Sequence, residues 1–476
     1  MENFDDQSLL IPSMSPSGIP FLDDIGEEFV DRGYNVTFLP QNREVAAEAE
    51  TDSVFHDSYL SSLVTHSPRC SLESLADKYG ISSTRSFVFP QMIYYYESSD
   101  PSALNVEEQG PRYPPVMSNK EPYPYETYLQ FLHKCLDFFD RLYEKGPGGN
   151  PVQYQGGEII RRTLDHVSRH HGFDSVWMGF SPIPGKSGFY TDESSKWSTI
   201  TESKWSEMTD DEIEEAKTYI SDIREKKPTV RSGGNNKSSL LRIAAAGLNR
   251  LARGEKETIP KYSWRIKKRI RRDILSRYSR YRYQSLEESL KSINNCEYVF
   301  YPLQYCLESR IAMRAPAFFN QSWFIEYLSR SVPTNNELII KDHPHQLGAQ
   351  PRKAVDIITR YATAVSPSLN AHRVIKNSNV VVTLNNTVGY ESLIYGKPVV
   401  TLGDAFYDDY TTNVNDINSL DKYIREAMNS GGLNEEKVIE FTHGLLSGSR
   451  DGVWSDRSSE NIKNTVDGYL SVLERK

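Results

Sequence analysis

Short apolar runs alternate with amphipathic stretches in the first part of the chain. An apolar run at 9–12 is followed by a turn-rich segment, by apolar residues at helical spacing over 20–32, and by a second apolar run at 35–39. Strand, small-residue loop, helix and strand are the opening of a doubly wound α/β domain. A generic βαβ unit without a ligand has the same pattern, and this segment alone does not separate the two.

The same alternation returns after residue 290. Apolar strands are predicted at 297–302, 337–341, 379–384 and 398–402, a short helix at 387–395, and an amphipathic helix at 458–474. The run at 379–384 is continuously apolar, as in a parallel strand that is buried on both faces. We therefore predict an α/β fold with two Rossmann-like domains, whose last helix crosses back. The predicted domains are 1–225 and 291–476, joined by a basic linker and helical region at 226–290.

Composition supports a globular protein of this size. The chain has 476 residues, 38% hydrophobic and 25% charged, which is enough for two α/β cores. It contains no run of about 18 apolar residues, and its acidic start lacks the features of a signal peptide. Its four cysteines do not show metal-ligand spacing. We expect a cytoplasmic protein with reduced thiols, with no metal and no cofactor beyond a co-substrate.

Charge is spread unevenly along the chain. The net charge is −9, yet residues 250–282 contain thirteen Lys or Arg and only three acids, with aromatic residues between them. One interpretation is a surface helix pair at an anionic membrane, on its inner face; another is a solvated face that bridges the domains. We favour membrane contact. The acidic remainder and the lack of a recognised motif argue against nucleic-acid binding.

Two strand ends in the second half carry candidate binding residues. Asn385, Asn386 and Thr387 stand where the buried strand gives way to a helix, and the free N–H groups and dipole of a helix start attract anions. Gly389 would let a phosphate or ribose approach, and Glu391 could accept hydrogen bonds from sugar hydroxyls. The alternative is a well-capped helix with no ligand.

The other strand end holds Lys341, His343 and Pro344. Pro344 biases His343 toward extended geometry, so that the imidazole is displayed from a loop. A histidine there can donate to a phosphate, and Lys341 adds a cation. A plain strand end followed by a turn is the alternative.

Together these motifs resemble the capsule polysaccharide biosynthesis family, which includes transferases that use CMP-activated 3-deoxy-octulosonic acid (Kdo). The resemblance covers roughly residues 297–410. Its segments are Phe300-Tyr301-Pro302-Leu303-Gln304, Lys341-Asp342-His343-Pro344, Asn385-Asn386-Thr387-Val388-Gly389-Tyr390-Glu391, Gly396-Lys397-Pro398 and Leu402-Gly403-Asp404-Ala405-Phe406-Tyr407. The family commonly has serine where Asn386 stands and aspartate where Glu308 stands.

The resemblance implies a GT-B architecture with two domains that face a central cleft. It also implies that His343, Asn386 and Thr387 hold the phosphate of CMP and that Glu391 holds the ribose. In the first domain, Glu158 follows two glycines at a helix start, where it could act as general base or nucleophile. Arg161 and Arg162 could bind a sugar carboxylate. A favoured first-turn glutamate and a solvated arginine face are the structural alternative.

The predicted function is a glycosyltransferase that moves a sugar from a nucleotide-sugar donor to a glycan or lipid-linked acceptor. The donor implied by the resemblance is CMP-linked. Two alternatives remain at this point: a CDP-polyol phosphotransferase of the teichoic-acid kind, and a non-catalytic scaffold of a polysaccharide export complex.

Overall fold

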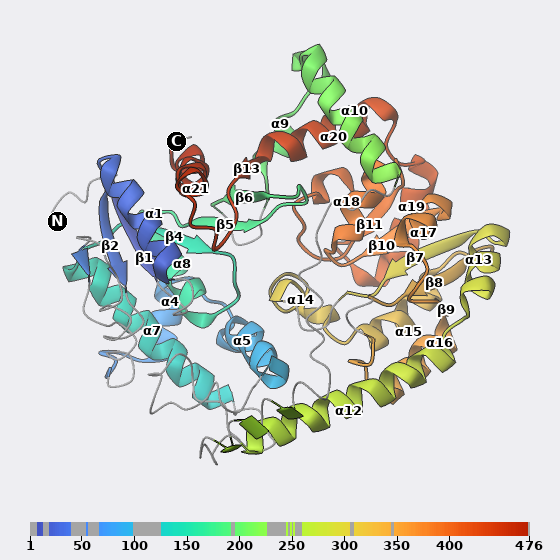
Figure 1. Cartoon of the computed structure of the whole chain (residues 1–476), viewed down its shortest axis with the longest axis horizontal. Helices are drawn as coiled ribbons and strands as arrows, with labels where there is room; N and C mark the ends of the chain where they lie inside the picture. The colour runs from blue at the N-terminus through green and yellow to red at the C-terminus, as the bar shows by residue number, and fades with distance from the viewer. Residues whose placement is uncertain are drawn as a thin grey trace. The chain divides into compact units, whose positions relative to one another are not determined.

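The computed structural model describes residues 7–12, 19–39, 54–55, 66–98, 125–191, 196–225, 244–245, 248–249, 251–252, 259–304, 309–343 and 347–474. The chain forms two compact units (Figure 1). Unit 1 combines Met1–Ser195 with Ser449–Lys476, and unit 2 is Lys196–Gly448. Within the described ranges, no helix is long and apolar enough to cross a membrane.

Unit 1 is built on a seven-stranded sheet in the order β13-β6-β5-β4-β1-β2-β3. Its strands are β1 (Ser8–Pro12), β2 (Asn35–Leu39), β3 (Val54–Phe55), β4 (Asn150–Tyr154), β5 (Val176–Phe180), β6 (Lys186–Tyr190) and β13 (Ser449–Asp451). The first five run parallel, while β6 is antiparallel to β5 and to β13.

Helices cover both faces of this sheet. Neighbouring residues of β1 point to opposite faces, so they belong to two different hydrophobic cores. Leu9 and Ile11 belong to a core shared with α1 (Ile19–Asp31) and α21 (Ser459–Leu473). Leu10 belongs to a second core, with α4 (Leu72–Lys78), α5 (Thr84–Ser98), α7 (Tyr125–Lys145) and α8 (Ile159–His170). Figure 1 shows α21 beside α1. The last helix therefore returns to the first unit, as predicted.

Unit 2 is built on a six-stranded, fully parallel sheet in the order β12-β11-β10-β7-β8-β9. Its strands are β7 (Tyr298–Pro302), β8 (Glu337–Lys341), β9 (Thr363–Val365), β10 (Val380–Thr383), β11 (Val399–Thr401) and β12 (Thr412–Asn413). Both units are doubly wound, which confirms the predicted α/β class with two Rossmann-like domains.

The helices of unit 2 include the short one that the sequence predicted at 387–395. They are α9 (Ser198–Glu202), α10 (Asp210–Arg224), α12 (Ile259–Arg282), α13 (Leu286–Asn295), α14 (Ser309–Arg314), α15 (Gln321–Ser331), α16 (Arg352–Tyr361), α17 (Ala371–Asn377), α18 (Thr387–Ile394), α19 (Leu420–Ser430) and α20 (Glu435–Gly448). Short 3-10 turns lie at Trp205–Glu207, Pro316–Phe318, Asp408–Tyr410 and Ile417–Ser419.

The units differ in their bounds from the predicted domains. Residues 196–225 belong to unit 2 because α9 and α10 pack against α20; Thr199 Oγ1 donates to Gly444 O at 3.0 Å. The helix α12 packs on α16 and is part of unit 2 rather than a linker. Residues 226–243, predicted as the start of that linker, lie outside the described residues.

Candidate functional site

Each sheet has a point where its strand order reverses, and ligands bind there in doubly wound folds. In unit 2 this point lies between β7 and β10, so the segments that flank it are Leu303–Gln304 and Leu384–Asn386. In unit 1 it lies between β1 and β4, and β4 leads into Gln155–Glu158. Two of the loops that the sequence singled out, Leu384–Asn386 and Gln155–Glu158, therefore lie at a switch point, whereas the strand end at Lys341–His343 follows β8 and does not.

A buried amide network joins the loops of unit 2. Gln304 Nε2 donates to Asn385 Oδ1 at 2.7 Å, and Gln321 Oε1 accepts from the Gln304 backbone N–H at 2.8 Å. Asn385 is only 4% exposed. Its side chain thus connects the loop after β10 to the loop after β7. This is a positioning role, whereas the sequence predicted that Asn385 contacts the nucleotide-sugar.

Asn386 is the N-cap of α18, which begins at Thr387 as the sequence predicted. Its side chain accepts from Val388 N at 3.0 Å, and its Nδ2 donates to Pro302 O at 3.3 Å. Thr387 is the first helical residue and is partly exposed. Of this loop, Asn386 and Thr387 are the residues that remain accessible to a ligand.

Gly389 is required by a different neighbour from the one predicted. A Cβ at this position would lie 2.2 Å from Tyr407 Oη and 2.4 Å from Tyr407 Cζ. The Tyr407 hydroxyl, next to Gly389, donates to Asn386 O at 2.6 Å. The space beside Gly389 is therefore filled by a tyrosine ring that holds the helix start, whereas the sequence predicted that this glycine lets a phosphate or ribose approach.

Lys341 and Asp342 are both buried at the end of β8. Lys341 is 6% exposed, and its ammonium donates to Pro367 O at 3.3 Å and to Asp342 O at 3.4 Å. Burial lowers the pKa of this ammonium. Burial also raises the pKa of the Asp342 carboxyl to about 6, although Tyr283 Oη donates to it at 3.2 Å. Lys341 therefore supports the strand end and does not present its charge to a phosphate.

His343 is the exposed member of this strand end. It follows the buried pair directly and lies at the surface of unit 2. Pro344, which was predicted to set its geometry, lies outside the described residues. At this strand end, the imidazole of His343 is therefore exposed to solvent, while the ammonium of Lys341 is buried.

Glu391 lies one turn into α18 and is partly buried. Burial raises the pKa of its carboxyl to about 7. Burial, and after it the negative charge of Glu391, raises the pKa of the hydroxyl of Tyr219, from α10, and of the hydroxyl of Tyr395. It receives no hydrogen bond or ion pair within the described part of the chain. A carboxyl in this setting is half protonated near neutral pH.

Glu158 is the N-cap of α8 in unit 1, directly after the two glycines. Its side chain makes no cap hydrogen bond and lies 3.6 Å from Arg161 Nε. Arg161 is buried and also donates to Tyr154 O. A Cβ on Gly156 would lie 2.1 Å from Glu158 Oε2, so the glycine allows the carboxylate to fold over the loop. Arg161 consequently orients the Glu158 carboxylate, while it also donates to the backbone carbonyl of Tyr154.

Arg162 points elsewhere than Arg161. It donates to Phe87 O and its guanidinium lies 4.2 Å from the centre of the Phe87 ring. These contacts attach α8 to α5, so the predicted pair of arginines does not form one carboxylate clamp. Among the described side chains, no group of three or more His, Cys, Asp or Glu is placed to hold a metal ion.

Sequence reasoning gave no role to Gln304, Tyr283 or Tyr407. All three are buried, and each fixes a loop at the end of a strand. Gln304 and Tyr407 stood within the run that resembles the capsule family, which was the available signal. The hydrogen bonds themselves depend on loops that lie tens of residues apart in the chain.

The two doubly wound units define an α/β protein with two Rossmann-like domains. Residues 238–419 match the family described as "Capsule polysaccharide biosynthesis protein". The match encloses all of the motifs on which the resemblance was based, so it confirms the predicted resemblance over this segment.

Individual relatives are distant. Protein FixF of Sinorhizobium fredii is 30% identical over 131 residues, which is 26% of this chain and 31% of the relative, so the chain matches about a third of that protein's length. The Thermosulfurimonas dismutans KpsC beta Kdo 2,7 transferase is similar with a TM-score of 0.39 at 12% identity, over 70% of this chain and 88% of that one. A Rickettsia africae glycosyltransferase is similar with a TM-score of 0.31 at 8% identity, over 98% and 99%.

Proposed function

We propose that this protein is a glycosyltransferase of capsule-type polysaccharide synthesis, which moves a sugar from a nucleotide-activated donor to a glycan or lipid-linked acceptor. The observation that carries the proposal is the switch point of unit 2. There the Gln304–Asn385 hydrogen bond holds two strand-end loops together beside the N-terminus of α18. This site lies inside the segment that matches the capsule family.

Three groups support binding of the donor's phosphate at this site. Thr387 is partly exposed at the first turn of α18, where the helix dipole favours an anion. Asn386 fixes that turn, and His343 is exposed at the end of β8. A protonated or N–H-donating imidazole would bind a phosphate oxygen with a charge-assisted hydrogen bond. Lys341 is left out of the binding set because its ammonium is already bonded to backbone carbonyls.

The donor we propose is CMP-linked, with an acidic keto-sugar such as Kdo. This part rests on the family, whose members include transferases that use this donor. In unit 1, we propose that Glu158 is the general base that takes the proton of the acceptor hydroxyl, with Arg161 as its positioning residue. The Arg161 guanidinium, with Nε 3.6 Å from Glu158 Oε2, would fix the direction in which this carboxylate points.

Calorimetric titration with CMP, CDP, UDP and GDP tests the proposal. We expect CMP to bind selectively, and His343→Ala to weaken its affinity by roughly tenfold or more, since a hydrogen bond to a charged group is lost. His170→Ala removes an exposed histidine on α8 and serves as the matched control with unchanged affinity. Unaltered CMP binding by His343→Ala would sink the site assignment.

The catalytic role needs a second readout. Glu158→Gln should leave CMP affinity intact and lower donor turnover by roughly a hundredfold or more. Full activity in that variant would remove Glu158 from the mechanism. Binding of CDP-polyols in place of CMP-sugars would instead indicate a phosphotransferase, and no binding by any nucleotide would favour a scaffold.

A further inference from the structure

The long helix α12 has one face that unit 2 does not cover. Among its described side chains, Lys267, Ile270, Arg271, Ile274 and Tyr281 recur at helical spacing and are all exposed. Ile270 is 44% exposed, Ile274 61% and Tyr281 83%. Large apolar side chains at these values, on one side of a single helix, form a continuous stripe open to solvent, which we call the α12 stripe.

The opposite face of α12 is firmly attached to unit 2. Gly348 approaches so closely that a Cβ there would lie 2.2 Å from Arg272 O, and Arg272 Nε donates to Leu347 O at 3.4 Å. Further along, beside the α12 stripe, Tyr278 and Arg282 both bond to Asp356 of α16. The helix is therefore held in place by one face, and the exposure of the α12 stripe is a property of the folded unit.

The cations of α12 fall into two groups. Arg269 pairs with Asp273 at 3.1 Å, and Arg282 pairs with Asp356. On and beside the α12 stripe, Lys267, Arg271, Arg277 and Arg280 make no ion pair with the described part of the chain. The exposed cations on and beside the α12 stripe are thus ones that no acid in the described part of the chain neutralises.

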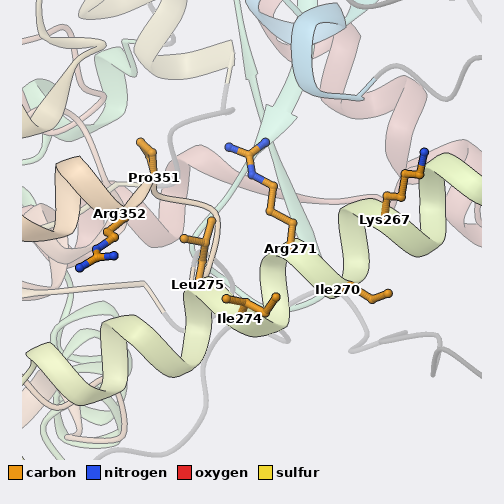
Figure 2. A pocket seen from close by; sticks show the side chains of 7 residues that line it. All are labelled: Lys267, Ile270, Arg271, Ile274, Leu275, Pro351 and Arg352. Atoms are coloured by element: carbon orange, nitrogen blue, oxygen red, sulfur yellow. The ribbon is translucent and has the colours of Figure 1, made fainter.

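A pocket of about 380 Å³ opens along the α12 stripe. Figure 2 shows Lys267, Ile270, Arg271 and Ile274 projecting from α12, with Pro351 and Arg352 beside them. Its cations come from both α12 and the start of α16, and its apolar lining comes from the exposed isoleucines and Pro351. The pocket combines positive charge with apolar surface, on the scale of a lipid headgroup and the first part of its chains.

We propose that the α12 stripe docks on an anionic membrane surface, with Lys267, Arg271 and Arg277 at the lipid phosphates and with Ile270 and Ile274 in the headgroup region. Long basic side chains beside apolar ones suit this boundary, because the charged ends reach the phosphates while the stems cover apolar surface. The overall charge of −9 does not oppose such docking, since only the local field within about 10 Å matters at physiological salt.

A nucleic acid is the other large polyanion that positive charge would attract. It would use the cations but would leave the two exposed isoleucines without a partner, because single strands stack on aromatic rings and duplexes present phosphates. The apolar residues of the stripe therefore favour the lipid surface. This inference does not depend on sugar transfer, and it can be tested on the full chain without a donor.

Co-sedimentation with vesicles tests the proposal. We expect the full chain to bind vesicles that contain roughly 30% phosphatidylglycerol and not vesicles of phosphatidylcholine alone, with binding lost as salt is raised to about 0.5 M. Arg271→Gln with Arg277→Gln should weaken binding roughly 25-fold, since each cation near an anionic surface contributes about a fivefold factor. Ile274→Ser should weaken it several-fold with no change in charge.

The matched control is Arg373→Gln with Lys376→Gln, two exposed cations on α17 that carry the same charge change. It should bind vesicles as the unaltered chain does, and circular dichroism should show all variants folded. Equal binding to neutral and anionic vesicles, or equal loss in the α17 control, would overturn the proposal. Tight binding to single- or double-stranded DNA with no vesicle binding would also overturn it.

Discussion

Glu391 and Asp342 are two acids whose pKa is raised by burial, to about 7 and about 6. Neither is paired with a described cation that offsets this cost, although Lys341 lies next to Asp342. Folding therefore favours the neutral form of both carboxyls. The ordinary pKa of a glutamate is 4.5, so for Glu391 the rise to about 7 corresponds to about 3 kcal/mol by which the folded state disfavours the ionised form.

The pH dependence of stability follows from this shift. Between about pH 4.5 and pH 7 the unfolded chain loses the Glu391 proton while the folded chain keeps it, so stability falls as pH rises and levels above pH 7. We expect Glu391→Gln to raise the free energy of unfolding by roughly 1–3 kcal/mol at pH 8 and by almost nothing at pH 4. Urea unfolding at both values measures this. Glu426→Gln, at an exposed position on α19, should show no such pH-dependent gain; an equal gain there would disprove the argument.

At the scale of single residues, the sequence identified the loops at the strand ends, but it did not show what each side chain in those loops contacts. It singled out Asn385, Asn386 and His343 correctly as strand-end residues. It did not show that Lys341 is turned inward or that Tyr407 fills the space beside Gly389. The direction of a side chain at a strand end depends on neighbours that come from distant parts of the chain.

The helix α18 depends on its first turn, and that turn is held from three sides. Asn386 caps the helix, its amide reaches Pro302 O, and Tyr407 bonds to its carbonyl. Because α18 is short, with eight residues, its position comes from these contacts rather than from helix propensity. The proposed anion-binding end of α18 is therefore held by three separate segments of the chain.

Two variants that each lack a helix cap separate the contribution of Asn386 to stability from its contribution to nucleotide binding. Asn386→Ala and Asn370→Ala each remove an asparagine cap, the second from α17, where it accepts from His372 N at 2.8 Å. Each should cost about 1 kcal/mol in urea unfolding. Only Asn386→Ala should weaken nucleotide binding in calorimetry. Equal affinity in both variants would show that the α18 turn does not contact the ligand.

Elements with a strong apolar pattern were predictable, and polar ones were not. The strands β1, β2, β7, β8 and β10 are buried runs that the pattern placed closely. By contrast β13 has the sequence Ser-Arg-Asp and forms only because it pairs with β6. No local signal marks such a strand, since its stability comes entirely from hydrogen bonds to a distant segment.

On the scale of the whole molecule, unit 2 is inserted between two parts of unit 1. The returning segment supplies β13 and α21, whose Ile462, Val466 and Tyr469 are buried against β-strands of unit 1. Tyr469 Oη also donates to Gln153 O at 3.0 Å. The first 195 residues consequently lack part of their own core until this segment is in place.

Truncation after Gly448 tests that dependence. Burial of three such side chains contributes on the order of 5–8 kcal/mol, which is comparable with the stability of a whole domain. We expect the truncated chain to lose the unfolding transition of unit 1, with rapid proteolysis of residues before 195 and protection of 259–448. Lys463→Ala, an exposed change on α21, is the control. A truncated chain with an intact unit 1 would contradict the role assigned to α21.

The insertion also imposes an order of events on protein synthesis. A ribosome releases residues 1–195 first, but their sheet lacks its last strand and one covering helix until residues 449–474 emerge. Unit 2 is complete before that moment and can fold as a unit, whereas unit 1 must keep apolar surface exposed while more than 250 residues are made. We therefore expect residues 1–195 to be the part of the nascent chain that most exposes apolar surface to chaperones.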